Sequence, residues 1–440
     1  MATKASSPAA VFLACGLSAA AINVMARESG FTKRSGGKIR AVDFLAQLCA
    51  ESIKGTVSLN DIAAAIHAYT GVSASRQAYG ERINDEALLF FQTVLAELIR
   101  SKLSSAAWSR CPLYKRILIQ DSTIIQLPTK LFEHFSGVRN SICAVCNARI
   151  QGIYDLCSGR FIQFSIDAYS KNDLSVAPQI PVEPGDLVLR DRGYFLLSTI
   201  AAHKAQGVDT ITRYKHKTTL YDPHTQAPLN LLSLLTERQA VDRIVLAGEK
   251  KDVRLRLLAV PVPNEVANLR RMKAKKEVRG HNPSAEILAL MGWSIFLVTI
   301  ENTALTIKTI IELYGLRWRI ENIFKTWKSQ FSFDKIHQVS ALQLRILLTA
   351  RFIMIVICYQ HAYLPICHAM LAYPNQLLSL MKFMRYVRKI LSLLPRLLAL
   401  EPNAVHAVAR YCSYDTRKRP NFVDNLRSLF ADLASLHQLA

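Results

Sequence analysis

Hydrophobic residues recur at helical spacing in the first part of the chain. The segments 42–53 (VDFLAQLCAESI) and 87–99 (ALLFFQTVLAELI) place apolar residues three and four positions apart, as in a helix with one buried face. Ser58 and Asn60 stand just before another apolar run, where helix caps are expected. The pattern predicts that residues 1–110 form a helical region.

The pattern then changes to that of β-strands. The apolar, β-branched run ILIQD (117–121) predicts a strand with Asp121 at or near its end. Residues 148–156 and 160–167 alternate apolar and polar positions, and Gly159 between them supplies the positive φ that a short turn needs. These two segments are predicted to form a hairpin.

A further strand-like run, LVLR, ends directly before Asp191. Helical spacing follows, and then another strand (207–215) that ends in the cations Arg213 and Lys215. Strands that alternate with helices predict an α/β fold with a mixed sheet, of which residues 111–215 form the first part.

The alternation pauses over residues 216–292, where β-like runs are followed by a basic run. These residues are predicted to form a mainly β insertion, whose basic run is either a solvated helix face or a phosphate-binding surface. The α/β pattern resumes over 293–375 with the strand WSIFLVTI, and residues 376–440 are leucine-rich and helical. The basic run comprises Arg270, Arg271, Lys273, Lys275, Lys276 and Arg279.

One predicted helix, Leu313 to Lys328 (LYGLRWRIENIFKTWK), groups polar side chains on a single face. Tyr314, Arg317, Glu321 and Lys328 lie at offsets 0, 3, 7 and 14. At about 100° per residue they share a face roughly 60° wide, opposite an apolar face. This pattern fits either a solvated face of an amphipathic helix or a helix that lines a metal and phosphate site.

The charge balance favours a polyanionic partner. Lys and Arg number 55 against 33 Asp and Glu, which gives a net charge of +22. Nucleic acid is the first candidate and an anionic membrane the second. The cations of the N-terminal helical region favour contact with DNA there, although a solvated bundle has the same pattern.

Cysteine usage and hydropathy favour a cytoplasmic protein. The nine Cys residues follow no disulfide framework, and Cys143 and Cys146 form a lone C-x-x-C without a second metal-binding pair. The apolar run 346–360 contains Arg351, and we interpret it as a buried core helix rather than a membrane span.

Three acids stand where a metal site can form. Asp121 and Asp191 follow strand-like runs, and Glu321 is presented by the helix described above. Carboxylates are hard oxygen ligands that suit Mg²⁺ or Mn²⁺, and two such ions can activate a nucleophile and stabilise a leaving oxygen on a phosphodiester. Each acid by itself also fits an ordinary surface or turn residue.

The residues of this helix complete a known signature. The chain resembles the bacterial insertion-sequence transposases of the DDE type, in the cut-and-paste group marked by Tyr-x2-Arg-x3-Glu-x6-Lys. Here the signature is Tyr314, Arg317, Glu321 and Lys328, and the surroundings of Asp121 (QDST) and Asp191 (LRDRGYF) are also similar. The resemblance is weakest after about residue 375.

The resemblance implies an RNase H-like catalytic core with two Mg²⁺ or Mn²⁺ ions. It implies that Asp121, Asp191 and Glu321 bind the metals, and that the other signature residues hold phosphates near the cleaved DNA end. Trp293 lies where the group places an aromatic that stacks a flipped base, or else it is a core residue. The implied reaction is hydrolysis at the element end, passage through a DNA hairpin, and joining to target DNA.

The resemblance also implies the partners. They are double-stranded DNA, both element ends and target, and a second copy of the chain in a paired-end complex, with the leucine-rich C-terminal region as a candidate interface. A membrane is not expected. Two other hypotheses remain open: a catalytically silent, transposase-derived DNA-binding protein, and a membrane-surface or scaffold protein that uses the C-terminal basic helices.

Overall fold

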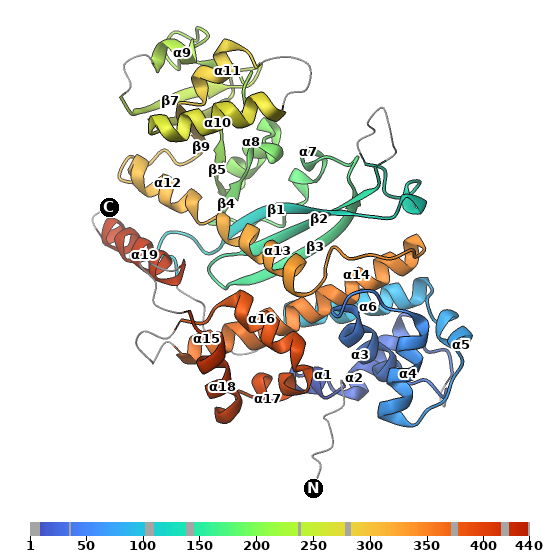
Figure 1. Ribbon diagram of the computed structural model, residues 1–440. Coiled ribbons are helices and arrows are strands. Elements are labelled where there is room, and N and C mark those ends of the chain that lie inside the picture. The colour runs from blue at the N-terminus through green and yellow to red at the C-terminus, as the bar shows by residue number, and fades with distance from the viewer. Residues whose placement is uncertain are drawn as a thin grey trace. The chain divides into compact units, whose positions relative to one another are not determined.

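The computed structural model describes residues 9–34, 37–101, 110–137, 145–235, 239–277, 283–370, 377–414 and 422–438. The chain divides into two compact units (Figure 1). Unit 1 comprises Met1–Trp108, Ser122–Lys171 and Arg319–Asn421, and unit 2 comprises Ser109–Asp121, Asn172–Trp318 and Phe422–Ala440. Helices accompany strands that pair both in parallel and antiparallel, which makes the fold mixed α/β.

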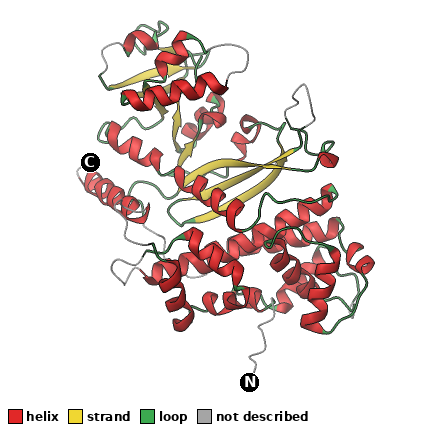
Figure 2. Ribbon diagram, in the orientation of Figure 1, coloured by secondary structure: helices red, strands yellow, loops and turns green. Residues whose placement is uncertain are grey.

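Helices make up most of unit 1 (Figure 2). The predicted N-terminal helices are present; Ser58 caps α4 reciprocally with Asp61, whereas Asn60 lies inside that helix. The first group is α1 Ala10–Ala14, α2 Ala19–Glu28, α3 Ala41–Ser52, α4 Leu59–Thr70, α5 Arg76–Gly80 and α6 Asp85–Arg100. The second is α13 Trp318–Gln330, α14 Ala341–Val356, the π-helix η4 Ile357–Tyr363, α15 Leu364–Met370, α16 Leu380–Lys389, α17 Leu394–Leu398 and α18 Pro402–Cys412. Short 3-10 turns are η1 Thr129–Leu131 and η5 Leu391–Leu393.

Unit 1 also contains the predicted hairpin, formed by β2 (Asn147–Asp155) and β3 (Arg160–Ala168). Gly159 has φ +72° in the turn, as a tight reversal requires. Aromatic side chains join the hairpin to α13, because the Trp327 ring lies 5.0 Å from Phe161 and 5.7 Å from Phe164. This contact fixes the buried face of α13.

The long apolar helix of unit 1 is a core helix. Arg351 of α14 is fully buried, and its guanidinium donates to four backbone carbonyls, those of Ser52, Gly55, Phe333 and Lys335, at 2.8 to 3.0 Å. Ala341–Met370 has the length and composition of a membrane span, but 78% of its most apolar window is buried inside the protein. The predicted core position of residues 346–360 is confirmed.

Unit 2 is built on a mixed sheet in the order β1-β4-β5-β9-β8-β7-β6. The parallel strands are β1 (Ile117–Gln126, of which the first half belongs to this unit), β4 (Leu187–Arg190) and β5 (Asp209–Arg213). The antiparallel strands are β6 (Leu220–Tyr221), β7 (Val241–Ala247), β8 (Val253–Pro261) and β9 (Trp293–Val298). Helical elements of this unit are α7 Asp173–Val176, η2 Ala177–Gln179, η3 Arg192–Tyr194, α8 Leu197–Ala205, α9 Leu231–Leu234, α10 Asn264–Glu277, α11 Ala285–Leu290, α12 Ile307–Gly315 and α19 Phe422–Gln438.

The β-like runs between residues 216 and 292 extend this sheet. Strand β8 pairs with β9 from Arg256↔Val298 to Pro261↔Trp293, and β9 in turn pairs with β5. A buried apolar cluster lies on one face of these strands and includes Leu255, Leu257 and Leu297. The strands of the segment 216–292 therefore share a sheet with β4 and β5 inside unit 2. The segment is not mainly β, because its described part also contains α9, α10 and α11, and the predicted domain boundaries stay a prediction.

Two sequence-based predictions about local structure were wrong. Asp121 does not end its strand, because β1 continues to Gln126 through the β-branched residues that follow. Leu313 to Lys328 is not one helix: α12 ends at Gly315 and α13 begins at Trp318. Gly315 weakens the helix interior, and the turn that follows uses hydrogen bonds three residues apart, such as Arg317 N to Tyr314 O.

Candidate active site

The sheet register brings Asp121 and Asp191 to matching positions of adjacent strands. Parallel pairing between β1 and β4 runs from Ile117↔Leu187 to Gln120↔Arg190. The next residue on each strand is an aspartate, and Asp191 keeps an extended backbone (φ −81°, ψ 169°). Neighbouring strands lie about 4.8 Å apart, and alternation sends both aspartates to the face opposite Gln120 and Arg190. The carboxylates of Asp121 and Asp191 are therefore neighbours.

The opposite face at this point is buried and polar. Gln120 Nε2 donates to the Val176 carbonyl at 3.1 Å, and Arg190 donates to the carbonyl of Ala177. Both side chains are only 2% exposed, and burial lowers the pKa of Arg190 to about 10, so that it remains a cation. These contacts join the segment from α7 to η2 to the strand ends and stiffen the backbone that carries both aspartates.

Arg317 lies directly against one of the aspartates. Its Nη1 is 2.9 Å from Asp121 Oδ2, and the two side chains are 8% and 15% exposed. The guanidinium also lies over the rings of Tyr314 and Trp318, at 5.7 and 5.8 Å from their centroids. A signature cation therefore sits at the acidic site, in a position where a phosphate would find both charge and directed donors.

Tyr314 is the centre of an aromatic and cationic cluster. Its ring meets Phe296 of β9 edge-on at 4.9 Å, and the Arg213 guanidinium lies 5.5 Å from Phe296 and 5.7 Å from Tyr314. Burial raises the pKa of Tyr314. The cations Arg317 and Arg213 oppose this rise, whereas the Asp191 carboxylate adds to it. Three other predicted site residues of unit 2, Arg317, Asp191 and Arg213, thus influence this phenol. Lys215 is exposed beyond the end of β5.

Trp293 begins β9 as predicted and is half-buried. It packs against the apolar cluster of the sheet, which is the arrangement of the core alternative. Its carbonyl accepts a hydrogen bond from Arg270 Nη1 of α10 at 3.0 Å, and Arg270 Nη2 reaches Ser294 Oγ at 3.3 Å. Burial lowers the pKa of Arg270, and the neighbouring cations Arg213 and Arg192 lower it further. The described part of the basic run therefore includes a cation beside the Tyr314 cluster; Arg279 lies outside the described residues.

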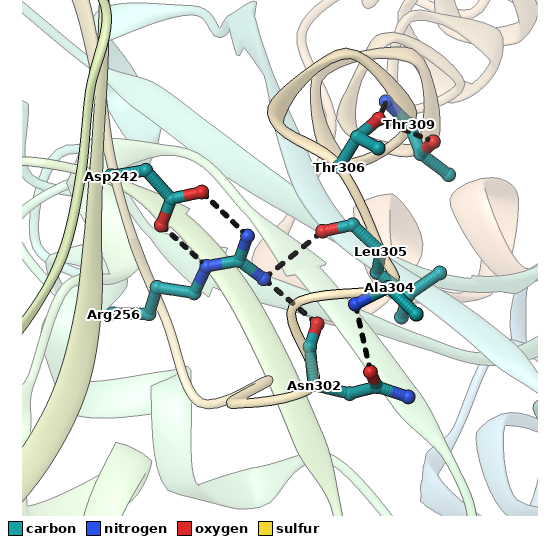
Figure 3. A network of polar contacts seen from close by, with 7 residues as sticks. All are labelled: Asp242, Arg256, Asn302, Ala304, Leu305, Thr306 and Thr309. Carbon is teal, nitrogen blue, oxygen red and sulfur yellow. Dashed lines mark hydrogen bonds and ion pairs between the residues drawn. The ribbon is translucent and has the colours of Figure 1, made fainter. Parts of the chain in front are cut away.

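An ion pair between a buried arginine and a partly exposed aspartate holds the start of α12. Figure 3 shows Arg256 of β8 bound to both carboxylate oxygens of Asp242, each at 2.7 Å. Arg256 Nη1 also donates to the carbonyls of Asn302 and Leu305, at 2.9 and 3.0 Å, directly before the Thr306 cap of α12. Arg256 is 1% exposed. This contact positions α12, whose last turn carries Tyr314.

Sequence reasoning missed Arg256, Asp242 and Phe296. A signal was present for Arg256, since a cation inside a strongly apolar strand needs a buried partner. The sequence near Arg256 could not identify its partners, because one of them, the Asn302 carbonyl, is 46 residues away. Phe296 carried no signal beyond its place in a strand.

Glu321 and Lys328 belong to unit 1. Both are half-buried on α13, whose apolar face packs on the hairpin. Lys328 Nζ donates to the Ile124 carbonyl in the second half of β1 at 2.7 Å, and burial lowers its pKa. Arg319, in the first turn of α13, donates to the Tyr359 hydroxyl at 3.3 Å. These contacts fix the orientation of α13 within its own unit.

The predicted triad is divided between the units, with Asp121 and Asp191 in unit 2 and Glu321 in unit 1. Among the residues that the structure describes, no three His, Cys, Asp or Glu side chains are grouped to hold a metal ion. Cys146 is buried, and Cys143 lies outside the described residues. Two adjacent carboxylates fit a hard divalent cation, and the meeting of all three acids stays a prediction.

Comparison with known proteins gives one family. Residues 113–357 match the family described as "Transposase DDE domain". The transposase for insertion sequence element IS231F of Bacillus thuringiensis subsp. israelensis is 28% identical over 362 residues, which cover 76% of this chain and 75% of the relative. The transposase for IS231D of Bacillus thuringiensis subsp. finitimus is 29% identical over 366 residues, covering 77% and 76%.

Two more distant proteins are also similar. The transposase for IS1151 of Clostridium perfringens is 25% identical over 351 residues, covering 72% of each chain. A solved structure, the piggyBac transposase synaptic complex with hairpin DNA, gives a TM-score of 0.42 with 9% identity over 90% of this chain and 82% of that one. A TM-score this low supports no argument about fold or function.

Proposed function

This chain belongs to the family of transposases with a DDE domain, and from that premise we propose that it cuts and joins DNA for an insertion sequence. It binds the terminal inverted repeats of the element, hydrolyses phosphodiesters at its ends and transfers the freed 3′ ends to target DNA. The register that makes Asp121 and Asp191 neighbours carries this proposal. A site for phosphodiester chemistry needs such an acidic pair beside cations that hold phosphate.

Asp121, Asp191 and Glu321 are proposed to hold two Mg²⁺ or Mn²⁺ ions. When bound, such ions activate an attacking oxygen and stabilise the leaving oxygen. The Asp121–Arg317 ion pair, at 2.9 Å, orients this carboxylate. Arg317 also has donors suited to a phosphate oxygen, so the pair links the metal site to the DNA strand.

The cations and Tyr314 are proposed to bind and orient the DNA end. Arg213 stacks on Tyr314, which fixes its guanidinium close to the acidic pair, and Lys328 is the phosphate-binding residue of unit 1. Lys215 supplies charge at the end of β5. Trp293 packs against the apolar cluster of the sheet but is only half-buried, and its exposed part is proposed to stack a base flipped from the element end.

Cut-and-paste transposition through a hairpin is the proposed order of reactions. Water first cleaves one strand and frees a 3′-OH. That hydroxyl attacks the opposite strand to close a hairpin, a second water reopens it, and the 3′-OH then attacks target DNA. Each step exchanges one phosphodiester oxygen for another, so the same acids serve all four. A homodimer pairs both ends, in the bacterial cytoplasm and at the nucleoid when bound.

Cleavage of a duplex that carries the element's inverted repeat, with Mg²⁺ present, tests the proposal. We expect Glu321→Gln to abolish cleavage and to leave end binding largely intact. The matched control is Glu312→Gln on α12, an exposed glutamate only 3.9 Å from Lys308, and this variant should cleave normally. Cleavage by Glu321→Gln at the wild-type rate would contradict the assignment of Glu321 to the metal-binding triad.

The alternative is a catalytically silent DNA-binding protein derived from a transposase. All the signature residues are present, which favours the enzyme. Tight, end-specific binding by the wild-type chain without cleavage in Mg²⁺ or Mn²⁺ would favour the silent protein.

A further inference from the structure

Helix α16 presents a cationic face that no part of the proposed active site uses. Its buried side consists of Leu380, Phe383, Met384 and Val387. At about 100° per residue, the remaining side carries four cations within an arc of roughly 120°. These cations are Lys382, Arg385, Arg388 and Lys389. Arg388 and Lys389 form no hydrogen bond or ion pair with other residues that the structure describes.

Two tyrosines extend this face onto α18. The rings of Tyr386 and Tyr411 stack at 6.2 Å with an angle of 18° between their planes, and Tyr411 is 61% exposed. The Arg410 guanidinium lies 5.7 Å from the Tyr411 centroid. We call Lys382, Arg385, Tyr386, Arg388, Lys389, Arg410 and Tyr411 the α16 strip.

The α16 strip meets the helix that carries Glu321. Arg385 Nε lies 3.4 Å from Gln330 Oε1, at the carboxyl end of α13. Lys325 of α13 is exposed and Lys328 is half-buried. The α16 strip therefore contacts the carboxyl end of α13 within unit 1.

The charge of this region is strongly one-sided. Residues 377–414 contain six Lys and Arg and a single acid, Glu401. That acid is paired with Arg396, away from the α16 strip, through two hydrogen bonds of which one is 2.6 Å long. Arg388 and Lys389 therefore have no carboxylate in this segment to neutralise them, and the partner that they fit is an extended polyanion.

We propose that the α16 strip binds duplex DNA outside the element's ends through its phosphates, without regard to sequence. Contacts of Lys and Arg with phosphates fix the position of a duplex but carry no sequence information. The Tyr411 ring already contacts Tyr386 and Arg410, so its hydroxyl is better placed for a phosphate than its ring is for a base. This inference rests on the proposed function, because a transposase must hold target or flanking DNA as well as its own ends.

The structure disfavours two other occupants. An amphipathic helix that lies on a membrane inserts its apolar face, whereas the apolar face of α16 is buried inside unit 1. A second copy is disfavoured because a cationic face would repel its own copy.

Duplex binding by the full chain tests the α16 strip. The double variant Arg388→Gln/Lys389→Gln removes one half-buried and one exposed cation, neither of which belongs to the buried side of α16. The control, Arg396→Gln/Lys308→Gln, removes two cations that lie beside Glu401 and Glu312. The probe is a duplex of about 40 base pairs without an inverted repeat, titrated from about 50 to 300 mM salt, where each neutralised phosphate contributes roughly 0.9 to the slope of log K against log salt.

We expect the slope to become shallower by about 1.8 in the double variant and to stay unchanged in the control. Equal slopes in both variants overturn the inference. Loss of binding to phosphatidylserine vesicles, with the duplex slope unchanged, would assign the strip to a membrane. A lower sedimenting mass with the slope unchanged would assign it to a second copy. Equal melting temperatures show that both variants fold, and because nothing is cleaved, the result is independent of the Glu321→Gln test.

Discussion

Replacing Arg256 by Met should loosen the start of α12 without unfolding unit 2. The change removes two bonds to Asp242 and two to the carbonyls of Asn302 and Leu305. Breaking a buried pair costs about 3–5 kcal/mol. Asp242 is 34% exposed, so water regains part of its solvation and the lower end of this range applies. Each 1.36 kcal/mol changes an equilibrium tenfold, so a loss of about 3 kcal/mol makes local opening, and with it hydrogen exchange, roughly 150-fold faster.

Hydrogen exchange followed by mass spectrometry measures this opening in peptides that cover α12. The control is Arg254→Met, two residues earlier on the same strand. Arg254 is 50% exposed and pairs with Glu301, which is 38% exposed. Such a surface pair contributes at most about 1 kcal/mol, or roughly a fivefold change in exchange. Equal effects of the two variants, or unchanged exchange in α12 with Arg256→Met, would refute the role of Arg256 in positioning this helix.

Two further predictions concern buried groups. Arg351→Met leaves four carbonyls without their donor, and we expect it to destabilise unit 1 by about 3–5 kcal/mol in urea unfolding, with Arg345→Met on the same helix as the milder control. Burial lowers the pKa values of His203 and His361 to about 4, from an unfolded value of 6.5. Both are neutral when folded, so their contribution to stability is complete above about pH 6.5 and is lost as the pH falls toward 4. The urea midpoint measured across that range should fall less steeply in His203→Gln and His361→Gln than in the wild type.

Local patterns in the sequence predicted most of the elements. Alternation around Gly159 gave the hairpin, and the run before Asp191 gave β4, because each is encoded within about ten residues. The cap at Ser58 and the core position of Arg351 could also be predicted. A serine before an apolar run usually caps a helix, and an apolar run too short to span a membrane is usually part of a core.

Pairings between distant residues could not be predicted in the same way. Arg351 bonds to Ser52 across 299 residues, and Arg256 bonds to Asn302 across 46. The periodicity of apolar residues does not predict such distant partners. The register of β1 against β4 was hidden for the same reason, although it is what makes Asp121 and Asp191 neighbours. The break after Gly315 was missed because the apolar spacing continues across it.

That break changes the meaning of the signature. Tyr314 and Arg317 lie in unit 2, whereas Glu321 and Lys328 lie in unit 1. The fixed interval between Arg317 and Glu321 therefore does not specify an angle on a helix. It specifies a fixed length of chain between Arg317 in unit 2 and Glu321 in unit 1, whose proposed roles are phosphate binding and metal binding.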